Sequence, residues 1–217
     1  MVIKSLNAAT PPEQKIWKLV RPFVPKRLSW FYEGCPEVPG QMWYADRKAL
    51  YQTIRRYKPR VVCESGTWLG GGSTYFIAQA LSDNGGGILH TTEVMPEFHA
   101  KAAQGYARHL SRLLPLVQFH LGTSAQVYSV LLPQIAPVDA LLLDGAEDAQ
   151  ETVHEFRMFE PFLSPKAVVM AHDWNTDKML LLRPILETAS EWRLRQAVIP
   201  PHSVGFAVFE RTLAGAS

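Results

Sequence analysis

The residues with the clearest chemical potential lie in a glycine-rich segment that begins at an acid. A short apolar run, residues 61–63, ends at Glu64, and Ser73 and Thr74 later open an apolar run of helical length. The glycines between them are Gly66, Gly70, Gly71 and Gly72. Glycine lets the backbone turn sharply and approach a ligand closely, and a helix N-terminus adds unpaired N–H groups and a partial positive charge. The segment therefore predicts a ligand-binding loop between a strand and a helix.

Three glycine motifs compete for this loop. A P-loop needs lysine where this chain has Gly72, and the dinucleotide fingerprint G-x-G-x-x-G needs glycine where it has Trp68. The pattern E-x-G-x-x-x-G fits at Glu64, Gly66 and Gly70. This stretch resembles motif I of the class I S-adenosylmethionine-dependent methyltransferases. The G-G-S-T that follows is similar to the small-molecule O-methyltransferase branch, which includes catechol-type and antibiotic-tailoring enzymes.

Acids stand at the ends of four segments that the pattern predicts to be strands. They are Glu64, Glu93, Asp144 and Asp173. Ligands of open α/β sheets bind at the carboxyl ends of the strands, and an acid ending the second strand can accept the ribose hydroxyls of a nucleoside. That role is predicted for Glu93. Asp144 and Asp173 end strands expected to be neighbours, and two carboxylates there suit Mg²⁺ or another divalent cation.

The resemblance implies a larger set of residues that bind S-adenosylmethionine. They are Glu64, Gly66, Thr67, Gly70, Ser73, Thr74, Glu93, Thr123, Ser124 and Asp144. In the resembling family the loop after the third strand passes the adenine edge, which nominates Thr123 and Ser124. Many family members carry an acid in this loop, and this chain has none.

The resemblance also suggests a metal site and a catalytic base. Metal-dependent relatives place an Asp after the fourth strand and an Asp-Asp or Asp-Asn pair after the fifth. Here Asp173 is followed by Trp174, and His172 stands where antibiotic-tailoring relatives carry an acid. The predicted metal ligands are Asp144, Asp173 and His172. The predicted catalytic residues are His172, Asp144 and Glu147, the last at a position where relatives often carry a lysine or histidine base.

A series of alternating elements must position these residues. The predicted strands are 61–63, 88–92, 117–121, 138–143, 167–171, 193–199 and 204–209. The predicted helices are 45–57, 73–81, 96–114, 125–132, 149–161 and 180–192. The last two strands are joined by a turn so short that they must pair antiparallel. Over residues 46–210 the resemblance implies a Rossmann-like, seven-stranded, mostly parallel sheet of order 3-2-1-4-5-7-6, with helices on both faces.

Residues 1–45 are predicted to form a separate N-terminal region, followed by a methyltransferase domain that binds S-adenosylmethionine at 46–217. A helix is expected to begin at Pro11 and Pro12 and to end near Pro22 and Pro25, before a stretch dense in aromatic residues. The region is expected to cover the domain, as a lid over cofactor and substrate or as plain hydrophobic packing. It is also a candidate contact for a homodimer.

Composition narrows the class of protein. The 217 residues are 47% hydrophobic and 19% charged, which predicts an ordinary globular core. A formal net charge of +2 gives no reason to expect nucleic acid as a partner. Two cysteines cannot make a disulfide framework. Neither a signal peptide nor a membrane span is read from the sequence, so a cytoplasmic protein is expected.

The prediction is a methyltransferase that uses S-adenosylmethionine and a divalent metal to methylate a hydroxyl of a small molecule. Three alternatives stay open. The first is a metal-independent methyltransferase with His172 or Glu147 as the base. The others are an NAD-dependent Rossmann oxidoreductase and a non-catalytic binding module that keeps the fold.

Overall fold

The computed structural model describes residues 12–25, 30, 32–201 and 203–212. Parts of the expected cover at 1–45, including the helix start at Pro11, lie outside the described residues, as does His202 in the last turn. The predicted helix near the N-terminus is present from Pro12, as α1 (Pro12–Val20) followed by a 3₁₀ turn at Arg21–Phe23.

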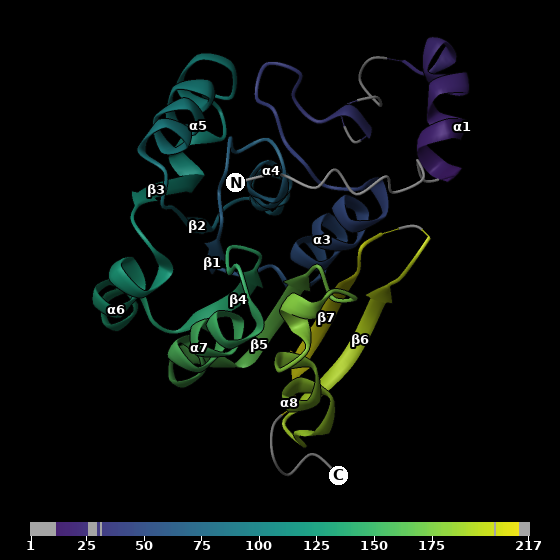
Figure 1. The fold of residues 1–217 in the computed structure, drawn as a ribbon. Helices are drawn as coiled ribbons and strands as arrows, with labels where there is room; N and C mark the ends of the chain where they lie inside the picture. Colours follow the sequence, from purple (N-terminus) through teal and green to yellow (C-terminus); the bar gives the residue numbers. More distant parts are fainter. Residues whose placement is uncertain (1–11, 26–29, 31, 202, 213–217) are drawn as a thin grey trace.

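The described chain forms one seven-stranded sheet of order β3-β2-β1-β4-β5-β7-β6 (Figure 1). Its strands are β1 (Val61–Ser65), β2 (Ile88–Glu93), β3 (Val117–Leu121), β4 (Val138–Leu143), β5 (Leu163–His172), β6 (Trp192–Val198) and β7 (Phe206–Arg211). The first five pair in parallel, and β7 is antiparallel to both of its neighbours. The predicted strand order and the antiparallel last strand are confirmed.

Helices cover both faces of this sheet (Figure 1). They include α3 (Tyr44–Tyr57), α4 (Ser73–Asn84), α5 (Pro96–His109), α6 (Ser124–Ile135), α7 (Ala149–Phe159) and α8 (Leu182–Thr188). Three predicted helices were too long. The one expected over 149–161 ends at Phe159, where a 3₁₀ turn at Glu160–Phe162 follows. The one expected over 96–114 ends at His109, because a turn and a 3₁₀ segment at Leu114–Leu116 lead into β3. The one expected over 180–192 shrinks to α8, because the chain leaves the helix at Ala189 to enter β6.

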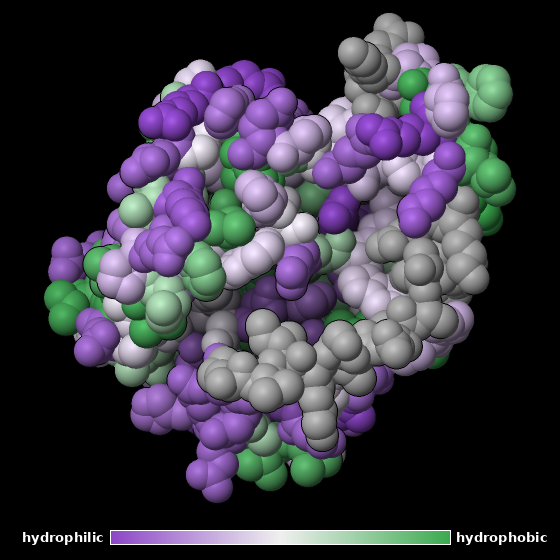
Figure 2. All heavy atoms as spheres, turned by 45° about the horizontal axis from the view of Figure 1, so that its top comes forward, coloured by the Kyte–Doolittle hydropathy of each residue, from purple (hydrophilic) through white to green (hydrophobic). Residues whose placement is uncertain are grey.

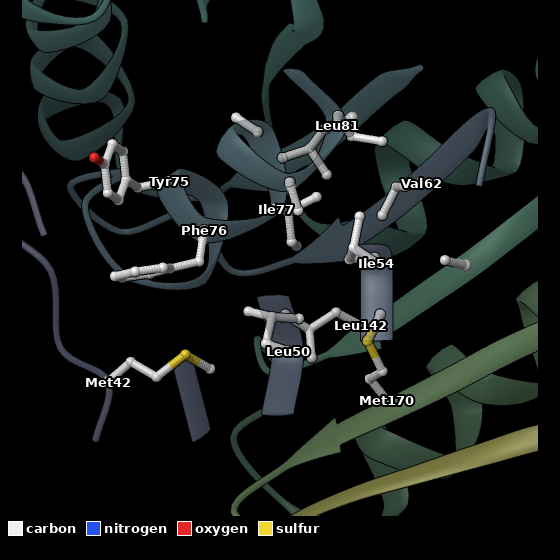
Figure 3. Packing of buried hydrophobic residues seen from close by; sticks show 14 of the residues in the cluster. Met42, Leu50, Ile54, Val62, Tyr75, Phe76, Ile77, Leu81, Leu142 and Met170 are labelled. Carbon is white, nitrogen blue, oxygen red and sulfur yellow. The ribbon is translucent and has the colours of Figure 1, made fainter. Parts of the chain in front are cut away.

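Alternate residues of the central strands build two cores. Along β4, Leu142 belongs to the core under α3, α4 and α5, and its neighbour Leu141 belongs to the core under α6, α7 and α8. Figure 3 shows the first core, where Leu50 and Ile54 of α3 meet the α4 side chains Phe76 and Ile77. Because both faces are covered, β4 is apolar at almost every position, as buried parallel strands are.

The carboxyl ends of β1, β2, β4 and β5 lie at one edge of the sheet, and each is followed by a loop that carries polar residues. Figure 2 turns the top of Figure 1 forward and shows a hollow near the middle of the face. In the part of the chain that the structure describes, no helix is both long enough and apolar enough to cross a membrane.

Candidate functional site

The glycine loop after β1 depends on two left-handed glycines. Gly66 has φ +93°, and a Cβ there would lie 3.0 Å from the Cα of Gly145 in the loop after β4. Gly70 has φ +81°, and a Cβ there would lie 3.1 Å from the ring of Tyr106, whose hydroxyl donates to the Gly70 carbonyl. Larger side chains would be strained at both positions. Gly66 lets two loops meet at the sheet edge, and Gly70 lets α5 pack beneath the turn.

Glu64 lies under this loop and is completely buried. Its Oε2 atom accepts hydrogen bonds of 2.7 Å from both Thr74 and Thr91, while its Oε1 atom is buried with no described partner. Burial raises the pKa of the Glu64 carboxyl to about 7, although hydrogen bonds from Ser73, Thr74 and Thr91 oppose the shift. Glu64 therefore supports the loop from beneath through neighbouring hydroxyl groups.

Glu93 ends β2 and holds the glycine loop in place. Its two carboxylate oxygens each accept a 2.8 Å hydrogen bond, one from the N–H of Trp68 and one from the N–H of Met95. The side chain is 8% exposed and lines a cavity at the sheet edge. A carboxylate oxygen can accept more than one hydrogen bond. Glu93 can therefore shape the loop and accept from a ligand hydroxyl at the same time.

The cavity at this edge has a volume of about 1120 Å³. Single-ligand pockets usually have about 300–1,000 Å³, so there is space for a cofactor and a second molecule. The predicted site residues that line the cavity are Gly66, Thr67, Ser73, Glu93, Thr123, Ser124, Asp144, Glu147, His172 and Asp173. Glu64, Gly70 and Thr74 are not among the lining residues of the described chain, because they lie behind the loop and support it.

Thr123 and Ser124 begin α6 at the far side of the cavity. The Thr123 hydroxyl accepts from the N–H of Gln126, as part of a capping box, so this side chain has a structural role. Behind them lies an acid that the sequence did not single out. Glu155 of α7 is 5% exposed and accepts a 3.0 Å hydrogen bond from Ser65. Burial raises the pKa of its carboxyl.

At the ends of β4 and β5 the structure brings Asp144, His172 and Asp173 together. His172 Nδ1 lies 3.0 Å from Asp144 Oδ1 and 3.4 Å from Asp173 Oδ1. On its other side, His172 Nε2 lies 3.3 Å from Asp46 Oδ2. Asp46 comes from the first turn of α3 and is completely buried. Three elements far apart in the sequence therefore meet at one imidazole ring.

An ammonium group completes this cluster. Lys178 donates a 2.6 Å hydrogen bond to the Asp144 carbonyl, and its Nζ lies 3.2 Å from Asp173 Oδ2. Burial favours a higher pKa for Asp144, but His172 and Lys178 outweigh it and lower the pKa. Burial favours a lower pKa for His172, but its carboxylate neighbours, Asp144 first, hold it well above the ordinary value.

The arrangement fits a divalent cation. Asp144 Oδ1, His172 Nδ1 and Asp173 Oδ1 offer one ligand atom each, all within 4.8 Å of one another. Adjacent ligands of an octahedral ion lie about 3 Å apart when the bonds are about 2.1 Å long, which matches the distances from His172. Once a cation displaces the proton from His172 Nδ1, the carboxylates of Asp46, Asp144 and Asp173 against the Lys178 ammonium leave a charge of −2 to hold it.

The other residues near β4 and β5 are placed differently. Glu147 is exposed and lines the cavity, with its own N–H donating to Glu151. Trp174 is buried against Phe209 and contributes no oxygen ligand. Asn175 pairs with Arg183 and Val204, which directs it away from the cluster.

Sequence reasoning missed Asp46, Lys178 and Glu155. Asp46 looks like an ordinary acid in the first turn of a helix, and only the packing of α3 against β5 brings it to His172. Lys178 follows Asp173 by five residues in an irregular loop, and that spacing has no periodic signature.

The strand order and the cavity at the carboxyl ends of β1, β2, β4 and β5 define a class I methyltransferase fold. A family model described as a methyltransferase domain matches residues 63–174, just over half of the chain. The chain belongs to this methyltransferase family. The expected family and fold are therefore confirmed. No curated protein sequence matches the chain.

Solved structures with this fold cover nearly the whole chain. The O-methyltransferase TomG from Streptomyces achromogenes, in complex with SAM, is 21% identical to this chain, with a TM-score of 0.68. The match covers 92% of this chain and 99% of the TomG chain. An O-methyltransferase from Bacillus cereus in complex with SAH is 18% identical, with a TM-score of 0.70, and the match covers 91% of this chain and 97% of that one. SAH-bound PaMTH1 from Podospora anserina is 13% identical with a TM-score of 0.64, covering 95% and 100%.

Proposed function

We propose that the protein transfers the methyl group of S-adenosylmethionine to a hydroxyl oxygen of a small molecule, with help from a divalent cation. The observation that carries the proposal is the cluster of Asp144, His172 and Asp173, which lines the same cavity as the glycine loop and Glu93. The similarity in fold to O-methyltransferases solved with SAM or SAH supports it. A small acceptor is favoured because one cavity contains both halves of the site.

In this proposal the cofactor lies along the glycine loop. The backbone at Gly66 comes close to the methionine end, and Glu93 accepts from the ribose hydroxyls. Thr123 and Ser124 would lie at the adenine end, and the aromatic pair Trp68 and Phe98 lines the same cavity. The sulfonium methyl would then point toward Asp144 at the end of β4.

The reaction moves one methyl group and one proton. The acceptor oxygen forms a bond to the methyl carbon as the bond from carbon to sulfur breaks, which leaves S-adenosylhomocysteine. The proton of the acceptor hydroxyl must reach a base, and Glu147 is an exposed carboxylate lining the same cavity as the cluster that can take it. Asp144, His172 and Asp173 would hold a divalent cation, which lowers the pKa of a bound hydroxyl and fixes its oxygen.

The N-terminal region is proposed to cover this reaction. Met42 and Trp43 line the cavity, and the preceding residues contact the glycine loop, where the N–H of Gly71 donates to the carbonyl of Pro39. Contact with both the loop and the cavity fits a cover that excludes water from the transferred methyl group. The separation into 1–45 and 46–217 remains part of the proposal.

The transfer itself is tested with methyl-labelled S-adenosylmethionine and a panel of phenolic, polyketide and sugar hydroxyls, with amine analogues beside them. We expect label on oxygen for at least one acceptor. In the variant Asp173→Asn, turnover should fall far more than affinity for S-adenosylhomocysteine. Asp173 would hold the cation that positions the acceptor hydroxyl, and it would not contact the adenosyl group. Label found only on nitrogen would contradict the proposal.

The cation is tested separately with a chelator. We expect excess chelator to remove turnover and Mn²⁺ or Mg²⁺ to restore it, without a change in S-adenosylhomocysteine affinity. Full turnover in excess chelator would eliminate the cation and leave His172 or Glu147 as the base of a metal-independent enzyme.

A further inference from the structure

The proposed metal cluster differs from an all-oxygen site in one ligand. The Nδ1 atom of His172 lies within 3.0 Å of Asp144 Oδ1 and 3.4 Å of Asp173 Oδ1. Trp174 and Asn175, which follow Asp173 in the sequence, are directed elsewhere by the contacts of the β5–α8 connection. The donor set that the described residues offer is therefore two carboxylates and one imidazole.

Asp46 contacts the side of the His172 ring that faces away from the other two carboxylates. Asp46 Oδ2 lies 3.3 Å from Nε2, and an ionised carboxylate can only accept a hydrogen bond. Nε2 therefore keeps its proton toward Asp46, and a cation beside Asp144 and Asp173 would displace the proton from Nδ1 and bind there. Histidine ligands commonly donate their other N–H to a carboxylate in this way. Lys178 acts similarly on Asp173, because its ammonium contacts Oδ2 and leaves Oδ1 toward His172.

Ligand type decides which ion such a site prefers. Mg²⁺ favours carboxylate, carbonyl and water oxygens, whereas imidazole suits later first-row ions such as Fe²⁺, Ni²⁺ and Zn²⁺, and affinity at sites of this kind rises from Mn²⁺ through Co²⁺ to Cu²⁺. We infer that this site takes a first-row transition-metal ion in preference to Mg²⁺, with His172 Nδ1 as a direct ligand and Asp46 as the residue that positions it. The inference rests on the proposed metal-assisted function and deepens it by naming the class of ion.

The ligand itself can be observed in the protein loaded with Mn²⁺. Pulsed electron paramagnetic resonance detects coupling between the ion and a directly bonded nitrogen, so the wild-type spectrum should show a ¹⁴N signal. Labelling histidine with ¹⁵N should convert that signal to the ¹⁵N pattern without any substitution. Bound Mn²⁺ with no nitrogen coupling would overturn the inference.

Ion preference is measured by calorimetric titration of Co²⁺ and of Mg²⁺ into the wild type and into His172→Asp. The control is His154→Asp, which changes an exposed histidine of α7. We expect the ratio of Co²⁺ to Mg²⁺ affinity to fall at least roughly tenfold in His172→Asp only, because an imidazole is exchanged for a hard oxygen. An unchanged ratio in a folded His172→Asp variant would contradict the inference.

The positioning role of Asp46 has its own readout. Asp46→Ala should weaken Co²⁺ binding by about 10–100-fold, while Asp46→Asn, whose amide oxygen can still accept from Nε2, should recover much of it. Equal affinity in all three proteins would remove Asp46 from the site. If S-adenosylhomocysteine binds but no divalent ion does, the metal inference fails while the cofactor part of the proposed function stands.

Discussion

At the scale of single residues, the site depends on carboxylates whose surroundings give them different roles. Glu64 is buried and has a raised pKa, Glu93 accepts from two backbone N–H groups, and His172 and Lys178 lower the pKa of Asp144. Four acids at strand ends look equivalent in the sequence. Their division into a supporting residue, a loop-shaping residue and ligand candidates comes from packing, which no local pattern encodes.

Glu64 should make the stability of the fold depend on pH. An acid whose pKa is higher in the folded state, here about 7 against an ordinary 4.5, stabilises the fold only while it is protonated. That contribution is complete below pH 4.5 and is lost as the pH rises through 7. Relative to Glu64→Gln, the wild-type free energy of unfolding should therefore fall by about 2 to 3 kcal/mol between pH 5 and 8. Urea unfolding of both proteins across this range measures it, and parallel curves would contradict the burial of a titrating Glu64.

Glu93 should contribute to cofactor affinity through a charged acceptor. Glu93→Gln keeps the size of the side chain but puts an amide NH₂ where one carboxylate oxygen accepts a backbone N–H. We expect S-adenosylhomocysteine to bind more weakly by about 1.5–3 kcal/mol, the range for hydrogen bonds to charged groups. Glu97→Gln, an exposed acid in the first turn of α5, is the matched control. Equal calorimetric affinity in both variants would remove Glu93 from the cofactor site.

At the scale of elements, the positions of the parallel strands could be predicted from the sequence, whereas the ends of several strands and helices could not. The predicted bounds of the third and fourth strands match β3 and β4, because apolar runs bounded by turn residues mark buried strands. The fifth strand begins four residues earlier than predicted, because Pro165 and Lys166 interrupt the apolar run while the strand continues past them. Helix ends were also misplaced, where 3₁₀ turns and short connections replaced the last turns.

The segment before α3 is the element whose role the sequence described least well. Val38 and Met42 belong to the core, while Gly40 and Gln41 line the cavity beside Gly72. The contact is close because a Cβ on Gly71 would overlap the carbonyl groups of Val38 and Pro39. This segment therefore joins the core and the cavity wall.

Gly71→Ala tests that contact. The added methyl group should push residues 38–42 away from the loop and lower the free energy of unfolding by about 1–3 kcal/mol, as overpacking does. Affinity for S-adenosylhomocysteine should fall with it, because the displaced segment lines the cavity. Thermal unfolding and calorimetry measure the two effects. If Gly71→Ala unfolds and binds S-adenosylhomocysteine like the wild type, residues 38–42 can move without affecting stability or the cavity, which would contradict this prediction.

At the scale of the whole molecule, the topology brings distant chemistry to one sheet edge. Parallel pairing of β1 with β2 and β4 places the glycine loop, Glu93 and Asp144 around one cavity, and α3 adds Asp46 from the far side of His172. The resemblance at residues 64–74 was enough to predict this fold, and most of the candidate site residues predicted from it line one cavity. The grouping of Asp144, His172 and Asp173 was also predicted from the sequence. Asp46 and Lys178 could not be predicted, because α3 and the Lys178 loop reach this cluster only through tertiary packing.

The central claim is that this cavity binds S-adenosylmethionine, and calorimetric titration with S-adenosylhomocysteine tests it most directly. Wild type should bind one molecule per chain, and NADH should not bind. Gly66→Val, checked for folding by its thermal unfolding, should bind none, because a branched side chain at φ +93° would enter the space between the two loops. Binding of NADH without S-adenosylhomocysteine, or equal affinity in Gly66→Val, would contradict the account.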